Sequence, residues 1–157
     1  MQIPETKDVL IVDDDRSIRG LIAVALNRHG LRCDTAGGGA EGIEMIAHTT
    51  YSVVVVDLMM PLIDGVAFIK ILRNREAKSS DRPVVLLMTA FPLQDVPELG
   101  NEVQALVAKP FDVIELANLI RDCVETQRRH HDSQNAVGSA DSPADVSATP
   151  PRPFDAK

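Results

Sequence analysis

The sequence predicts an α/β fold in which a five-stranded parallel sheet lies between helices on both faces. Short apolar runs alternate with amphipathic helical patterns between residues 9 and 124. The valine-rich runs are continuous rather than alternating in polarity, which is typical of strands buried on both faces of a parallel sheet. Because strand and helix alternate five times, the order also implies right-handed crossover connections.

Each strand is expected where apolar residues run together. The five runs lie at residues 9–12, 31–35, 53–56, 84–88 and 105–108, and the second and fifth are weaker. Helices are expected where apolar residues recur with the i, i+3, i+4 and i+7 spacing. These patterns lie at residues 18–25, 40–47, 66–72 and 113–124. Gly30 can close the first helix, and Asp112 and Glu115 form a D-x-x-E capping box at the start of the last.

Two segments depart from this regular alternation. Pro92 and Pro97 bracket the first turn of the helix expected between the fourth and fifth strands. That helix should be short or distorted, because proline has no backbone N–H and clashes with the preceding helical turn. Residues 128–157 are rich in Ala, Ser, Asp and Pro and lack apolar periodicity. We therefore expect a folded domain over residues 1–127 and a disordered tail over residues 128–157.

Composition and charge disfavour several classes of partner. The 157 residues suit one domain, and a hydrophobic content of 45% without tryptophan can supply an aliphatic core. A net charge of -7 argues against direct binding to nucleic acid or to an anionic membrane surface, since both attract basic faces. No run approaches the ~18 apolar residues of a membrane span, and no secretory pattern is seen, so a cytoplasmic protein is expected. Cys33 and Cys123 lie outside any metal or redox spacing and are expected to be reduced thiols.

Polar residues follow four of the five expected strands. They are Asp13, Asp14 and Asp15 after the first strand, Asp57 after the third, Thr89 after the fourth, and Lys109 and Pro110 after the fifth. Ligands of open α/β sheets bind outside the carboxyl ends of the strands, so these side chains should converge at one edge. For Asp15 the more conservative interpretation is a helix N-cap, a common role of aspartate.

The chemistry of this cluster indicates phosphoryl transfer. Three carboxylates at close range repel one another unless a cation compensates, and Mg²⁺ prefers carboxylates together with water and phosphate oxygens. Lys109 would add a positive charge suited to a phosphate oxygen, and Thr89 a hydroxyl donor. Phosphoryl transfer depends on positioning and on charge neutralisation, both of which such a set can supply. A carboxylate would then act as the nucleophile and become an aspartyl phosphate.

Four short stretches carry a resemblance to a known family. Residues 12–15 (Val-Asp-Asp-Asp), 57–65 (Asp-Leu-Met-Met-Pro-Leu-Ile-Asp-Gly), 88–90 (Met-Thr-Ala) and 108–111 (Ala-Lys-Pro-Phe) resemble receiver domains of two-component response regulators. The resemblance, strongest to single-domain regulators of the chemotaxis kind, covers residue 7 to about residue 127. It implies the flavodoxin-like (βα)5 fold with strand order 2-1-3-4-5.

The resemblance also implies a function and partners. Asp57 would accept a phosphoryl group from a phosphohistidine on a histidine kinase or phosphotransfer protein. The protein would catalyse only its own phosphorylation and dephosphorylation, and it would signal by contact with a downstream protein that the sequence does not identify. A homodimer is compatible with this scheme.

Roles for individual residues follow from the same resemblance. Asp14 would bind Mg²⁺ directly and Asp13 through water, while Asp57 and the backbone carbonyl of Met59 would complete the protein ligands. Lys109 would pair with Asp57 or its phosphate. In addition, Thr89 would donate a hydrogen bond to the phosphate, and the bond from Lys109 to Pro110 would be cis, which X–Pro bonds tolerate.

The sequence departs from the family near the site. Leu106 stands where the family usually has a tyrosine or phenylalanine that turns inward when the threonine moves, so this aromatic switch is missing. Met59 and Phe91 stand at two positions that flank the phosphoryl site. Large apolar groups there could hinder an attacking water and lengthen the lifetime of the phosphate, which is a hypothesis.

Two other classes of function compete with phosphoryl acceptance. A phosphatase of the haloacid dehalogenase type also uses an aspartate nucleophile and Mg²⁺, but it needs a D-x-D motif followed by a cap domain. Here the aspartates after the first strand are contiguous, and no cap domain is expected. A degenerate receiver would act as a constitutive protein-binding module. Leu106 and the irregular fourth helix argue mildly for that alternative. The intact site argues against it, namely Asp13, Asp14, Asp57, Thr89 and Lys109.

Overall fold

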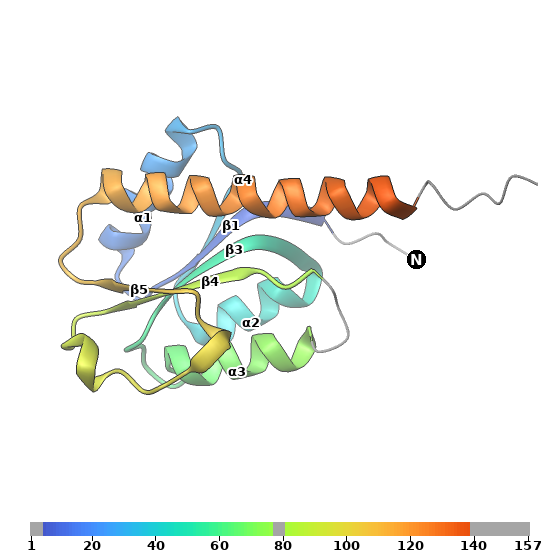
Figure 1. The fold of residues 1–157 in the computed structure, drawn as a ribbon. Coiled ribbons are helices and arrows are strands. Elements are labelled where there is room, and N and C mark those ends of the chain that lie inside the picture. The colour runs from blue at the N-terminus through green and yellow to red at the C-terminus, as the bar shows by residue number, and fades with distance from the viewer. Residues whose placement is uncertain (1–4, 77–80, 139–157) are drawn as a thin grey trace, which may run out of the picture.

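The computed structural model describes residues 5–76 and 81–138, and its centre is a five-stranded parallel sheet (Figure 1). The strands are β1 (Glu5–Val12), β2 (Cys33–Ala36), β3 (Thr49–Asp57), β4 (Val84–Thr89) and β5 (Ala105–Ala108). Their order in the sheet is β2-β1-β3-β4-β5, with every pair parallel. The predicted fold class and strand order are confirmed.

Four α-helices cover the two faces of this sheet in the described part of the chain. They are α1 (Arg16–Arg28), α2 (Gly39–His48), α3 (Gly65–Arg75) and α4 (Val113–Gly138). Helices α1 and α4 lie on one face, and α2 and α3 lie on the other (Figure 1). Alternate residues of β1 divide between the two cores, with Val9 and Ile11 in the first and Leu10 and Val12 in the second. This division explains why the strand sequences are continuously apolar.

Side-chain caps begin three of the helices. The Asp15 carboxylate accepts hydrogen bonds from the backbone N of Ser17 and of Ile18, as expected of an N-cap. Asp64 caps α3 in the same way, and Asp112 accepts from two backbone N–H groups at the start of α4. These caps end the loops that carry the polar residues, and they therefore fix where each loop joins its helix.

The connection from β4 to β5 contains no α-helix, although a short or distorted fourth helix was expected there. Two short 3-10 turns, Leu93–Asp95 and Gly100–Glu102, replace the fourth helix. The prolines explain the first part of this segment, since neither can donate a helical hydrogen bond. A buried Arg73 stabilises the second part, where its Nη2 donates to the Glu102 carbonyl at 2.6 Å and its Nη1 to the Pro83 carbonyl at 3.1 Å.

The last helix is longer than predicted, so residues 128–138 do not form the expected disordered tail. Helix α4 continues to Gly138, beyond the end of the sheet (Figure 1). The Arg128 guanidinium lies 2.7 Å from the Asp8 carboxylate, and His131 Nδ1 lies 3.3 Å from the Asp81 carboxylate. Contacts between distant parts of the chain thus support a polar helical segment that has no apolar periodicity of its own. Residues 139–157 of the expected tail lie outside the described residues.

No helix in the described ranges has the length and apolar character that crossing a membrane requires.

Candidate functional site

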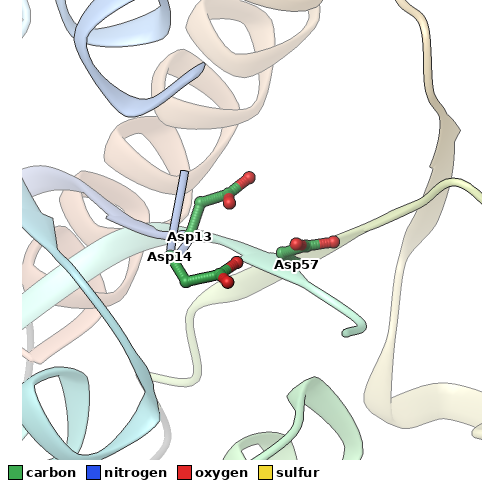
Figure 2. A group of neighbouring side chains, drawn as sticks. All are labelled: Asp13, Asp14 and Asp57. Carbon is green, nitrogen blue, oxygen red and sulfur yellow. The ribbon is translucent and has the colours of Figure 1, made fainter. Parts of the chain in front are cut away.

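Three aspartates meet at the carboxyl edge of the sheet (Figure 2). Asp13 and Asp14 follow β1, and Asp57 is the last residue of the adjacent strand β3. One carboxylate oxygen from each residue lies within 4.8 Å of the others. The structure therefore brings together the three carboxylates that were expected to converge.

The sheet topology explains why the site lies here. From β1 the chain passes to β2 on one side, and from β2 it returns past β1 to β3 on the other side. Such a switch of direction leaves a crevice at the carboxyl ends of the two central strands, where ligands of open α/β sheets bind. Asp13 and Asp57 stand at the ends of those two strands.

Lys109 lies between the two buried carboxylates of the cluster. Its Nζ is 3.0 Å from Asp13 Oδ2 and 3.2 Å from Asp57 Oδ2. The second oxygen of Asp13 accepts a hydrogen bond from the backbone N of Asp15 at 2.9 Å. Asp13 is fully buried and Asp57 is 6% exposed, whereas Asp14 faces solvent. One ammonium group thus serves two buried carboxylates, and a third carboxylate remains accessible beside them.

The pKa values reflect this uneven balance of charge. Burial raises the pKa of Asp57, the neighbouring charge of Asp13 raises it further, and the Lys109 ammonium offsets part of the change. For Lys109, burial acts to lower the pKa, but the hydrogen bond and charges of Asp13 and Asp57 together outweigh it and raise the pKa overall. Lys109 consequently keeps its charge, and the site as a whole favours the approach of a further cation.

Thr89 and Lys109 are joined through the backbone. The N–H of Lys109 donates to the Thr89 carbonyl at 2.7 Å, and the peptide bond between Lys109 and Pro110 is cis, as the resemblance implies. The Thr89 side chain is buried, and its oxygen accepts a hydrogen bond from the backbone N of Phe91 at 2.9 Å. A threonine hydroxyl that accepts in this way still has its own proton to donate.

Three apolar side chains stand exposed on the loops and strand near this edge. Met59 lies in the loop after β3, Phe91 in the segment after β4 and Leu106 in β5, with exposed fractions of 58%, 46% and 42%. Leu106 therefore does not turn into the core in this structure. The part that the Met59 carbonyl would play as a metal ligand stays a prediction.

Sequence reasoning missed two residues that shape the site. An added Cβ at Gly65 would lie 2.4 Å from the Asp57 carbonyl oxygen, so only glycine lets α3 begin this close to the end of β3. The second is Arg19, whose Nη1 donates to the Asp13 carbonyl at 2.7 Å. For Gly65 the available sequence signal is its pairing with Asp64, since aspartate before glycine favours a turn and a helix start. Nothing in the sequence pattern distinguished Arg19 from the other arginines of its helix.

The donor set of the cluster fits a hard divalent cation. Carboxylate oxygens are ligands that Mg²⁺ prefers, and one oxygen from each of the three aspartates lies within 4.8 Å of the others. Three carboxylates against one ammonium also leave a negative excess that a divalent cation would neutralise.

The fold and the site together define the class of protein: a flavodoxin-like α/β domain with an acidic, lysine-bearing site at the switch point of its sheet. A model of the response regulator receiver domain matches residues 9–121. The chain therefore belongs to the response regulator receiver domain family, whose members bind Mg²⁺ at an acidic pocket.

Individual relatives agree with this assignment. The transcriptional regulatory protein PmrA of Pectobacterium parmentieri is 34% identical over 130 residues, which cover 82% of this chain and 55% of that protein. The CheY-like receiver domain protein of Methanospirillum hungatei JF-1 superimposes with a TM-score of 0.67 at 26% identity, covering 78% of this chain and 97% of that one. Response regulator TrrA of Thermotoga maritima, solved in complex with Mg²⁺ and BeF, gives 0.62 at 26% identity, covering 74% and 98%. The chain spans about half or less of the length of the curated relatives it matches.

Proposed function

We propose that Asp57 accepts a phosphoryl group from the phosphohistidine of a histidine kinase or phosphotransfer protein in a Mg²⁺-dependent reaction. The protein then signals by contact with another protein, and it catalyses only its own phosphorylation and dephosphorylation. The observation that carries this proposal is the position of Lys109 Nζ, within 3.2 Å of Asp57 and 3.0 Å of Asp13, beside a third carboxylate. Family membership and the Mg²⁺–BeF complex of the TrrA relative support the same function.

The proposed reaction uses one oxygen of Asp57 as the nucleophile. It attacks the phosphorus, an O–P bond forms, and the P–N bond to the donor imidazole breaks, with its electrons returning to the histidine. Lys109, already 3.2 Å from Asp57 Oδ2, can pair with a phosphoryl oxygen, and Thr89 can donate its hydroxyl proton to another. Asp13 holds Lys109 in place from the other side.

Asp13, Asp14, Asp57 and the Met59 carbonyl would hold the Mg²⁺. When bound, the ion supplies positive charge that offsets the charge of the carboxylates and of the phosphoryl oxygens. Asp57 must be ionised to attack, so the burial that raises its pKa works against the reaction, and Lys109 works in its favour.

The test is a reaction with acetyl phosphate and Mg²⁺, followed by intact mass. We expect the wild type to gain one phosphoryl group, and Asp57→Asn or prior addition of a chelator to prevent the gain. Asp64→Asn is the matched control, because asparagine also serves as an N-cap and this cap of α3 contacts Ala67 rather than the cluster. A folded wild type that gains no phosphoryl group under any condition would contradict the proposal.

Two observations favour a second function. The β4–β5 connection has no α-helix, and Leu106 stands exposed where the family has an inward-turning aromatic residue. A receiver that binds a partner constitutively would need neither the fourth α-helix nor an aromatic residue that turns inward. Absence of both phosphorylation and beryllofluoride binding, in a folded protein, would support this alternative.

A further inference from the structure

We propose that Arg19 is a positioning residue that holds the peptide between Asp13 and Asp14 and so aims the Asp14 carboxylate at the cation. This inference rests on the proposed Mg²⁺-dependent function. Arg19 is not a ligand, since its guanidinium is cationic and contacts a backbone carbonyl. Its role would be to keep the one accessible carboxylate of the cluster where a cation can use it.

The contacts around Asp13 show how the turn is held. The backbone N of Asp13 donates to the Ala36 carbonyl at 3.2 Å, and its carboxylate is engaged by Lys109 and by the backbone N of Asp15. The Asp13 carbonyl accepts a hydrogen bond from Arg19 Nη1 at 2.7 Å. Because a peptide unit is planar, fixing this carbonyl also fixes the direction in which the chain enters Asp14.

Helix geometry explains why position 19 can reach back to this turn. Arg19 lies four residues after the N-cap Asp15, and its backbone N donates to the Asp15 carbonyl at 3.1 Å. Side chains of a helix point toward its N-terminus, so a long side chain one turn into α1 extends over the preceding loop. The loop in question is the one that carries Asp13 and Asp14.

A neighbouring loop encloses the guanidinium. A Cβ added to Gly37 would lie 3.6 Å from Arg19 Nη1 and 3.3 Å from the Glu41 carboxylate, which accepts a hydrogen bond from the backbone N of Gly37 at 2.7 Å. A Cβ at position 37 would therefore be in van der Waals contact with the Arg19 head group, and a larger side chain there would compete with it for space. Arg19 is held between two loops of the site edge rather than extended into solvent.

The sign of the expected effect separates positioning from simple electrostatics. Removal of a positive charge near the cluster should strengthen the binding of Mg²⁺ if charge alone matters. Removal of a positioning contact should weaken it, and groups that orient metal ligands typically contribute 10- to 100-fold to metal affinity. We therefore expect Arg19→Ala to raise the Kd for Mg²⁺ about tenfold.

The experiment measures Mg²⁺ affinity by calorimetry and, separately, the rate of phosphorylation by acetyl phosphate across a range of Mg²⁺ concentrations. For Arg19→Ala we expect the Mg²⁺ dependence to shift to higher concentration while the rate at saturating Mg²⁺ returns to within about twofold of wild type. Arg19→Lys, which keeps a donor, should recover part of the affinity. Arg28→Ala removes the same charge from the exposed end of α1 and should leave both measurements unchanged.

Each outcome bears on a different claim. A wild type that neither binds Mg²⁺ nor takes a phosphoryl group contradicts the proposed function itself. A functional wild type together with unchanged or tighter Mg²⁺ binding in Arg19→Ala overturns the role of Arg19 alone. Should Arg19→Ala fail to fold, Gly37→Val replaces it, since a larger side chain there displaces the guanidinium without removing it. Wild-type affinity in a folded Gly37→Val would then count against the role.

Discussion

The two edges of the sheet both hold buried aspartates, but their charges are balanced differently. At the amino edge, Asp8 is almost fully buried, and its two oxygens are engaged separately by the Arg128 guanidinium and the backbone N of Arg32, each at 2.7 Å. At the carboxyl edge, Asp13 and Asp57 share the single ammonium of Lys109, and Asp14 adds a third carboxylate.

This difference separates a structural cluster from one that can bind a ligand. A buried charge needs an opposite charge or hydrogen bonds, or else it costs stability. The amino edge satisfies Asp8 from within the chain. The carboxyl edge leaves a deficit of positive charge that a cation from solution can supply, and it leaves Asp14 exposed for that purpose.

The largest effect is expected where the shared ammonium is removed. Lys109→Met keeps most of the side-chain volume but leaves the phosphoryl oxygens without their positive partner, and we expect phosphorylation to slow by about 100-fold or more. The rate is measured by intact mass with acetyl phosphate at saturating Mg²⁺. Lys7→Met is the control at the amino edge, where Lys7 pairs with Asp34 at 2.9 Å, and it should react at the wild-type rate. Equal slowing in both variants would remove the distinction between the edges.

The amino edge should respond in stability and not in reactivity. Asp8→Ala leaves the Arg32 N–H and the Arg128 guanidinium without their partner, so the free energy of unfolding should fall by about 2 kcal/mol. Urea unfolding gives this value. Arg128→Met should cost at least as much, because it leaves the buried Asp8 carboxylate without its guanidinium partner. Folded Asp8→Ala protein should be phosphorylated by acetyl phosphate at the wild-type rate. A much lower rate would show that the two edges are coupled.

The two edges also differ in how much of their structure could be predicted from the sequence. The valine runs determine buried parallel strands, and parallel strands bring their carboxyl ends to one edge, so the convergence of Asp13, Asp14 and Asp57 could be inferred from local patterns. The partners of Asp8 could not, since Arg128 is 120 positions away and lies in a polar stretch without periodicity. Such contacts support the last turns of α4, and for that reason the apolar periodicity predicts an end before Gly138.

The β4–β5 connection shows the same limit. Pro92 and Pro97 indicated a distorted helix, whereas two short turns stand there, and the buried Arg73 guanidinium donates to the Glu102 carbonyl in the second. Arg19 was overlooked for a related reason. Its partner is the backbone carbonyl of Asp13. Every residue has such a carbonyl, so the residue types do not show which carbonyl accepts a hydrogen bond from a side chain.

A smaller effect concerns the pH dependence of the metal-free protein. The pKa of Asp57 is raised in the folded state, so this group favours folding at low pH and that contribution is lost as the pH rises through its folded-state pKa. Asp57→Asn removes this pH-dependent contribution to the free energy of unfolding. In the presence of a chelator we expect the variant to be more stable than wild type by about 1 kcal/mol at pH 8 and to lose this advantage toward pH 4.

The measurement is urea unfolding of both proteins across that pH range. Asp15→Asn, which keeps the cap of α1 and removes a carboxylate outside the cluster, is the control and should show no such trend. If the stability advantage of Asp57→Asn over wild type grew toward acid pH, the pKa of Asp57 would be lowered in the folded state and the prediction would be wrong.

The smallest effect concerns the lifetime of the proposed phosphate. Met59 is exposed in the loop after β3, two residues from Asp57, and an apolar side chain there leaves an attacking water without a hydrogen-bond partner. Met59→Asn supplies such a partner, so dephosphorylation after removal of acetyl phosphate should become about threefold faster, equivalent to less than about 1 kcal/mol in the barrier. Leu62→Asn makes the same change of polarity on the same loop, at a fully exposed residue whose φ of 69° asparagine tolerates. A faster decay in Met59→Asn alone would assign protection of the phosphate to Met59, and equal decay in both variants and wild type would leave the carboxylates and Lys109 as the groups that determine its lifetime.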